Sequence, residues 1–96
     1  MIIVKVRTIL TLKTIMGGGE IELSFPEETT LGQLITTLVN RWGDELASYL
    51  YEPNSKSLRP YIRLMVNGRD IAFLERMETV LRNGDDVLIL PPVSGG

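Results

Sequence analysis

The stretch that decides the fold is LRNGDDVLILPPVSGG, residues 81–96. Its Asn83-Gly84-Asp85 segment predicts a tight turn, because asparagine and glycine tolerate positive φ. The almost wholly apolar run that follows, 86–90, predicts a strand deep in a sheet, since it lacks polar alternation. Pro91 has no N–H to give to a strand ladder and therefore predicts the end of this strand.

Two glycines, Gly95 and Gly96, stand at the end of the chain, and the sequence contains no histidine and no cysteine. The side chains that most often act as nucleophiles or metal ligands are therefore largely missing. The most distinctive chemical group left is the carboxylate of Gly96. Because neither glycine has a Cβ, this end fits a narrow channel, which is typical of a protein whose own terminus is a substrate.

Length and charge narrow the class of protein further. A chain of 96 residues fits one small domain. A net charge of −2 gives no general attraction to nucleic acid or to an anionic membrane. Charges within residues 1–10 interrupt any signal-peptide core, and no apolar run approaches the roughly 18 residues of a membrane span. We therefore expect a cytoplasmic protein with no nucleic-acid and no membrane partner.

The N-terminal third predicts a hairpin. Residues 2–12 alternate between apolar and polar side chains, which is typical of a strand with one buried face. Residues 17–19 are three glycines that suit the hairpin tip, and residues 20–25 alternate again before Pro26. A phosphate cradle at the glycines is disfavoured, because the lysine and Ser/Thr of a P-loop are missing. The side chains expected to point inward from the first strand are Ile2, Val4, Val6, Leu10 and Leu12.

A helix is expected next. Thr30 and Gln33 have the spacing of a capping box, in which each side chain bonds the backbone of the other residue. Residues 31–42 then carry one apolar stripe at helical spacing, on which Trp42 lies. Gly43 predicts the end of this helix, and residues 44–51 predict a short helical turn with Leu46 and Leu50 inward.

The remaining segments complete a mixed sheet. Residues 61–66 predict a strand that turns at Asn67-Gly68, a strong type I′ signal, and residues 70–74 form a short strand at best. The right-handed crossover rule places the strand 61–66 beside the first hairpin. The expected fold is α+β, a β-grasp (ubiquitin-like) sheet with one main helix on one face. We expect this domain to span 1–92, with residues 93–96 as a flexible tail.

These residues resemble a known family. Val66-Asn67-Gly68, the turn and strand 81–87 and the tail from Leu90 to Gly96 are similar to the ubiquitin-like sulfur carriers. The nearest resemblance is to the small subunit of molybdopterin synthase, with the thiamine-pathway sulfur carrier as a cousin. The resemblance covers nearly the whole chain, and its most specific part is the last sixteen residues. The segment 49–60 is longer than in the shortest members, which leaves the pathway open.

The resemblance implies a mechanism that depends on partner proteins. An adenylating enzyme of the ubiquitin-activating type uses ATP and Mg²⁺ to activate the Gly96 carboxylate, and this chain binds no cofactor itself. A persulfide on another protein then converts the adenylate to a thiocarboxylate. The sulfur passes to a precursor in a second partner, the large subunit of molybdopterin synthase or an equivalent acceptor enzyme. The chain is accordingly a protein substrate, or a non-catalytic small subunit, and not an enzyme in its own right.

Each part of the tail has an expected role in a partner channel. Gly95-Gly96 fits the narrowest part, where any Cβ would clash. Val93-Ser94 is expected to make extended backbone contacts with a partner groove. Pro91-Pro92 favours polyproline geometry, so the tail leaves the fold in one direction and loses less entropy on binding.

A docking patch is expected beside the tail. Ile9 has the parity of the polar side chains of the first strand, so it is an apolar residue on the outer face. The family resemblance places partner-contacting hydrophobic residues at Ile9 and Leu90, and Met65 would complete an exposed apolar patch. The alternative is that these are isolated exposed residues without a role.

Other functions stay open at this point. Sulfur could go to thiamine, to a modified tRNA nucleoside or to an amino acid instead of a molybdenum or tungsten cofactor. A di-glycine end can also be joined to a target lysine, which would make the chain a ubiquitin-like protein modifier. A stand-alone enzyme that uses Asp85 and Asp86 is disfavoured, because adjacent strand residues point to opposite faces.

Overall fold

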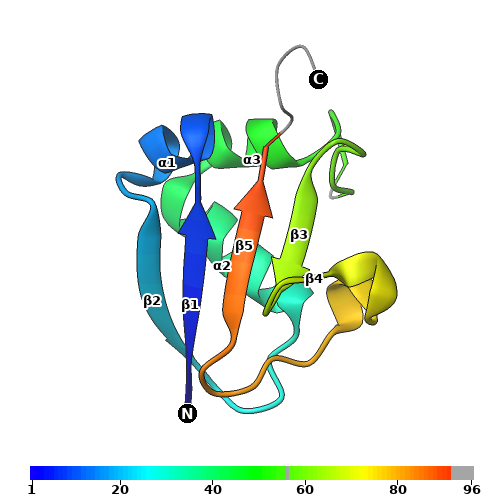
Figure 1. Cartoon of the computed structure of the whole chain (residues 1–96). Helices are drawn as coiled ribbons and strands as arrows, with labels where there is room; N and C mark the ends of the chain where they lie inside the picture. Colours follow the sequence, from blue (N-terminus) through cyan, green and yellow to red (C-terminus); the bar gives the residue numbers. More distant parts are fainter. Residues whose placement is uncertain (56, 92–96) are drawn as a thin grey trace.

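The computed structural model describes residues 1–55 and 57–91 (Figure 1). Within these residues, five strands, three helices and two short 3-10 turns follow one another. In order they are β1 (Ile2–Thr8), α1 (Leu10–Met16), β2 (Glu20–Phe25), α2 (Leu31–Trp42), α3 (Asp44–Leu50), β3 (Arg63–Val66), β4 (Arg69–Asp70), η1 (Ile71–Phe73), η2 (Arg76–Glu78) and β5 (Asp86–Leu90).

The strands form one mixed sheet in the order β2-β1-β5-β3-β4. β1 pairs antiparallel with β2 and parallel with β5, and β5 pairs antiparallel with β3. The predicted β-grasp sheet and the deep position of the last strand are thus confirmed. The position expected for the strand 61–66 is wrong: β5, not β3, lies beside β1. The more apolar strand takes the central place, where both of its neighbours shield it.

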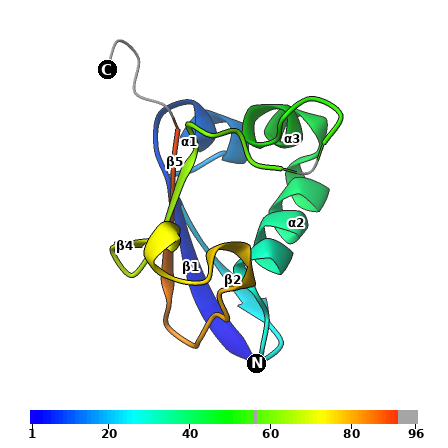
Figure 2. The same ribbon diagram turned by 90° about the vertical axis from the view of Figure 1, so that its right-hand side faces the viewer.

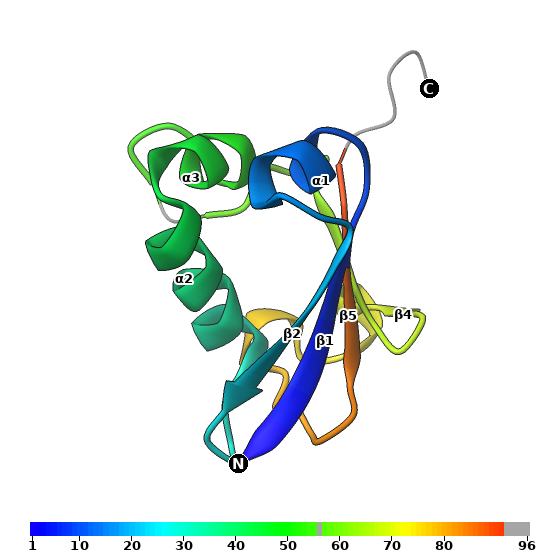
Figure 3. The same cartoon turned by 90° about the vertical axis from the view of Figure 1, so that its left-hand side faces the viewer.

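All three helices lie on one face of the sheet (Figures 2 and 3). The inward side chains of the central strands and of α2 are fully or almost fully buried, and each contributes about 1.5–3 kcal/mol through its removal from water. This core includes Val4, Val6, Val87 and Ile89 from the sheet and Leu31, Leu34, Ile35 and Leu38 from α2. The opposite, outer face of the sheet has no helix over it among the described residues and is the face seen in Figure 1.

The first strand is shorter than its alternation predicted. It ends at Thr8, and residues 10–16 form α1 instead of continuing the strand. Leu12 and Met16, four residues apart, are buried on one side of this helix, whereas Leu10 is exposed and was wrongly expected to point inward. Gly17 then ends α1 with φ of 76°, a left-handed conformation that favours glycine.

The predicted helix boundaries and turns are confirmed. Thr30 and Gln33 form the capping box, with backbone-to-side-chain bonds of 3.2 and 2.9 Å. Gly43 ends α2 with φ of 73° and donates to the carbonyl of Val39 at 2.7 Å. Asn67-Gly68 has φ of 52° and 83°, both positive as a type I′ turn requires. None of the helices within the described ranges is long and apolar enough to cross a membrane.

Candidate functional site

The reactive end predicted from the sequence lies outside the described residues. This applies to Pro92, Val93, Ser94, Gly95 and Gly96. The structure instead shows the strand that leads to them and the surface around it.

β5 holds the start of this tail at the centre of the sheet. Ile89 pairs with Thr8 on β1, and Leu90 pairs with Arg63 on β3. Pro91 follows directly and is buried. Neighbouring strands on both sides therefore position the backbone immediately before the predicted tail. β1 and β5 run in the same direction, so β5 ends at the edge of the sheet where α1 and α3 lie (Figure 1).

An apolar strip lies on the outer face next to this point. Met65 and Leu88 are direct partners in the β3–β5 ladder and are both half-buried. Leu90, two residues further along β5, has the same parity and is half-buried as well. The structure thus brings the predicted residues Met65 and Leu90 to one face, with Leu88 between them. Leu88 was not predicted, although its shared parity with Leu90 was the available signal.

Ile9 lies at the same end of the sheet. It is 41% exposed and follows Thr8, whose partner Ile89 directly precedes Leu90. Its neighbour Leu10 is 60% exposed and has φ of 56°, which is unusual for a large side chain. The prediction that Ile9 is exposed is confirmed. We call Ile9, Met65, Leu88 and Leu90 the outer-face patch.

Charged side chains border the outer-face patch. Arg7, the ladder partner of Leu88, forms an ion pair with Asp86 at 2.9 Å. Arg63, the partner of Leu90, pairs with Asp70 at 3.1 Å. Exposed pairs of this kind add about 0–1 kcal/mol each to stability. Their clearer effect is to fix arginine side chains beside an apolar strip, a combination that is common at protein interfaces.

The two adjacent carboxylates considered as a catalytic pair have structural roles. Asp85 accepts hydrogen bonds from the Asn67 side chain at 2.9 Å and from the backbone N–H of Arg82 at 2.8 Å. Asp86 is held by Arg7. The described part of the chain also contains no group of three acidic, histidine or cysteine residues that could hold a metal ion. The hydrogen bonds of Asp85 and Asp86 favour the turn interpretation of Asp85 over a catalytic pair.

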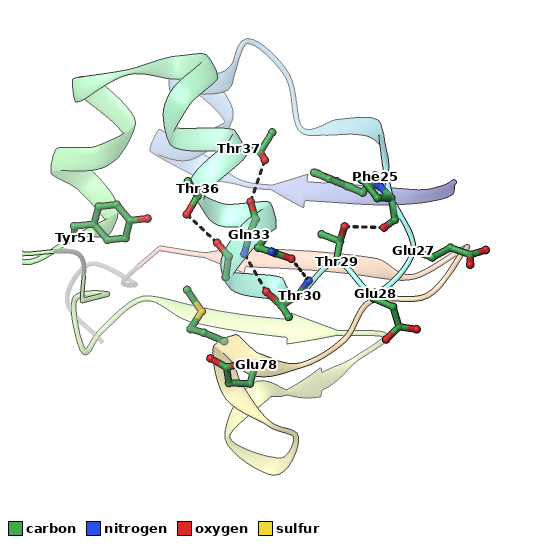
Figure 4. A pocket seen from close by; sticks show the side chains of 13 residues that line it. Phe25, Glu27, Glu28, Thr29, Thr30, Gln33, Thr36, Thr37, Tyr51 and Glu78 are labelled. Atoms are coloured by element: carbon green, nitrogen blue, oxygen red, sulfur yellow. Dashed lines mark hydrogen bonds between the residues drawn. The ribbon is translucent and has the colours of Figure 1, made fainter.

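A groove of about 760 Å³ runs along α2 on the other side of the molecule (Figure 4). Several of its hydroxyl groups are bonded to nearby backbone: Thr29 donates to Pro26, Thr36 to Gly32 and Thr37 to Gln33, at 2.7–3.1 Å. At its far end, burial raises the pKa of Tyr51 above its usual value, and the Thr36 side chain lowers it by less. Because these hydroxyl groups are already used, the groove is a weaker candidate site than the outer-face patch.

Comparison with known proteins gives a family match over most of the chain. The ThiS family model matches residues 9–96. The chain is 38% identical over 78 residues to a putative sulfur carrier protein of Archaeoglobus fulgidus, covering 81% of this chain and 85% of that protein. It is 30% identical over 92 residues to small archaeal modifier protein 3 of Haloferax volcanii, covering 96% of this chain and 97% of the relative.

Solved structures have the same fold. The solution structure of small archaeal modifier protein 1 from Methanosarcina acetivorans superposes with a TM-score of 0.81 at 31% identity, covering 100% of this chain and 98% of that one. The crystal structure of the Amycolatopsis orientalis BexX/CysO complex contains a chain that matches with a TM-score of 0.76 at 28% identity, covering 97% and 99%.

Proposed function

The chain belongs to the ThiS family of ubiquitin-like sulfur carriers, and from this premise we propose that it carries sulfur on the carboxylate of Gly96. The observation that carries the proposal is the extent of the family match, which runs to Gly96 and includes the whole tail. The central position of β5 supports it, because a strand held on both sides gives the tail a fixed origin.

The chemistry of a carboxylate explains why partners are needed. A carboxylate is a poor electrophile until one of its oxygens becomes part of a leaving group. An adenylating enzyme supplies ATP and Mg²⁺, and the Gly96 carboxylate displaces pyrophosphate to form an acyl adenylate. A persulfide sulfur then displaces AMP and forms an acyl disulfide. A second thiol, from the partner protein or from a small thiol, attacks the other sulfur of this bond, which releases the thiocarboxylate and leaves a disulfide on the donor side. In this scheme the chain contributes an unhindered end and a docking surface.

The outer-face patch is the proposed docking surface for the adenylating enzyme. Its apolar side chains, exposed at Ile9 and half-buried at the other three positions, lie near the point where β5 ends, so a partner that receives the tail also covers them. The Amycolatopsis orientalis structure is a complex of a CysO protein with BexX, which supports a protein partner for this kind of chain. Val93, Ser94 and Gly95 are proposed to lie in the partner channel, with Gly96 at its reaction centre.

For the destination of the sulfur we propose molybdopterin, for the molybdenum or tungsten cofactor. The acceptor is then the large subunit of molybdopterin synthase, and this chain is the small subunit. The resemblance of the tail and of the turn 81–87 to that subunit supports this choice. Thiamine and tRNA thiolation are the alternative destinations within the same carrier chemistry.

The test is direct. The chain is incubated with its cognate adenylating enzyme, ATP, Mg²⁺ and a persulfide donor, and its intact mass is measured. We expect the mass increase of one oxygen replaced by sulfur, and we expect deletion of Gly96 to abolish it while the melting temperature stays unchanged. Full sulfur transfer by the shortened chain would contradict the proposal.

A second candidate function has an observation in its favour. The chain is 30% identical over 96% of its length to a protein named small archaeal modifier protein 3. A modifier begins with the same adenylation but ends in an isopeptide bond to a lysine of another protein. Conjugates that carry this chain in a cell extract, and that are lost when Gly96 is deleted, would assign this function.

A further inference from the structure

A second exposed feature lies away from the outer-face patch, between β4 and β5. Phe73 is 81% exposed, more than any other large hydrophobic side chain of the described residues. It belongs to η1, which stands beside the β3–β4 edge of the sheet (Figures 1 and 2). One exposed hydrophobic residue is ordinary on a protein surface. A binding role for Phe73 therefore depends on how its backbone is held and on the charges of the neighbouring side chains.

The turn that carries Phe73 is fixed by a hydrogen bond at its start and by packing of the two residues that flank Phe73 and Ala72. Asp70 caps η1, since its Oδ1 accepts the N–H of Ala72 at 2.9 Å. Ile71 and Leu74 pack against the core, and the N–H of Leu74 donates to the carbonyl of Ile71 at 3.0 Å. Phe73 is thus presented on an ordered turn. Because the backbone of this turn is already ordered, less conformational entropy is lost when a partner covers the side chain that it carries.

The next turn, η2, fixes the segment to the helix layer. Met77 packs against the core, and its carbonyl oxygen lies 3.2 Å from the place that a Cβ on Gly32 would occupy. Arg76 has φ of 51°, a left-handed conformation that is unfavourable for a residue with a side chain, and it is exposed. The fold therefore tolerates backbone strain at an exposed arginine three positions after Phe73. Strain of this kind is often found at functional positions.

A basic groove of about 400 Å³ adjoins this segment. Arg59, Arg63 and Arg76 line it, and Asp70 is the one carboxylate among its described lining residues. That carboxylate already accepts two hydrogen bonds, one from the Arg63 side chain at 3.1 Å and one from the N–H of Ala72 at 2.9 Å. The groove is therefore positively charged, although the chain as a whole has a net charge of −2. An acidic segment of another protein complements it.

The groove is continuous with the surface next to the tail. Arg63 is the ladder partner of Leu90 in the outer-face patch, and it is also part of the groove lining. A protein that covers Leu90 while it binds the tail is therefore adjacent to Arg63. The groove, whose lining includes Ile71 and Ala72 of η1, lies next to Arg63.

We propose that Phe73, Arg63 and Arg76 form a second contact surface for the enzyme that adenylates Gly96, which covers them with an acidic segment and an apolar pocket. The identity of this partner rests on the proposed function. The charge of the groove selects an acidic partner, and phenylalanine and arginine are both enriched at protein interfaces. Charge pairing across an interface favours specificity and fast association. The surface thus lets the enzyme distinguish chains that have similar tails.

The experiment measures the affinity of the cognate adenylating enzyme for variants of the full chain by calorimetric titration at low and high salt. Phe73→Ala should weaken binding about 10-fold or more, as expected for a well-packed aromatic contact. Arg76→Gln should weaken it less and should reduce its salt dependence, because one screened charge pair is lost. Val80→Ala and Arg82→Gln are matched controls, since both residues are exposed and line a different hollow near Glu27 and Glu28.

The outcomes separate this inference from the proposed function. Melting temperatures of all four variants should match the wild type, since each changed side chain is exposed. If Leu90→Glu weakens binding but Phe73→Ala and Arg76→Gln bind like the wild type, the second contact surface is overturned and the proposed function stands. Losses of equal size in the control variants would also overturn it. If the wild-type chain is not adenylated at all, the proposed function fails by that measurement alone.

Discussion

The side chain of Asn67 joins two turns that are far apart in the sequence. Its Nδ2 donates to Asp85 Oδ1 at 2.9 Å, and its Oδ1 accepts the backbone N–H of Asp86, also at 2.9 Å. The turn between β3 and β4 is thereby bonded to the turn that precedes β5. The same turn before β5 is bonded to the start of β1, where Asn83 Oδ1 accepts the N–H of Ile3 at 2.8 Å. These bonds tie the three central strands together at the end opposite the tail.

Asn67→Ala should therefore destabilise the fold by about 1–3 kcal/mol, because it removes both bonds and leaves Asp85 without one partner. Asn54→Ala is the matched control. Asn54 also has positive φ, of 57°, but it makes no side-chain hydrogen bond among the described residues. Urea unfolding of the two variants measures the difference. Equal losses would show that the backbone conformation, and not the bonds, makes Asn67 important.

The capping box at the start of α2 gives a second prediction. Thr30→Ala should destabilise the fold by about 0.5–2 kcal/mol, since the N–H of Gln33 loses its acceptor. Thr37→Ala should be neutral or slightly stabilising, because Thr37 is exposed within the helix and alanine has the higher helix propensity. Thermal unfolding compares the two. A Thr37→Ala loss as large as that of Thr30→Ala would contradict the capping role.

Asp70 gives a prediction about pH. The N–H of Ala72 and, after it, Arg63 hold the pKa of this carboxyl below its usual value. A lowered pKa in the folded state means that Asp70 contributes stability above the pKa of the unfolded chain, near 3.9. This contribution is lost as the pH falls through the lower folded value. NMR titration of the carboxyl carbon should give a midpoint below the usual one.

The same titration can separate the two causes. Arg63→Gln should raise the midpoint of Asp70 only in part, since the N–H of Ala72 is the larger cause and remains. A midpoint at or above the usual aspartate value in the wild type would contradict the cap on η1. It would also weaken the case for an ordered turn beneath Phe73.

Local signals predicted much of this fold. The capping box of Thr30 and Gln33, the Asn67-Gly68 turn and the strand 86–90 are each specified by neighbouring residues. At residues 10–16 the sequence predicts a continued strand, because the apolar positions 10 and 12 keep the strand alternation. In the structure the buried residues are Leu12 and Met16, which are four positions apart, as one face of a helix requires.

The functional surface was predictable only in part, for a different reason. An almost wholly apolar strand has no polar alternation to mark its outward side chains, so parity with Leu90 is the one signal in this strand that points to Leu88. Its place on the outer face depends on its pairing with Met65 and Arg7. The position of Phe73 depends on how η2 packs against Gly32 of α2, a contact between segments far apart in the chain. No short sequence pattern encodes such a contact.

The outer-face patch gives the last prediction. Ile9→Lys should weaken binding to the adenylating enzyme by about 1–3 kcal/mol, because it places an unpaired charge in a contact that excludes water. It should leave the melting temperature nearly unchanged, since Ile9 is exposed and its backbone is extended, with φ of −137°. Thr11→Lys is the control, as it adds the same charge to an exposed position two residues away on α1. Calorimetric titration measures binding, and a melting curve measures stability. A large loss of stability with Ile9→Lys would remove Ile9 from the docking surface, and an equal loss of affinity with Thr11→Lys would indicate general charge repulsion instead of contact.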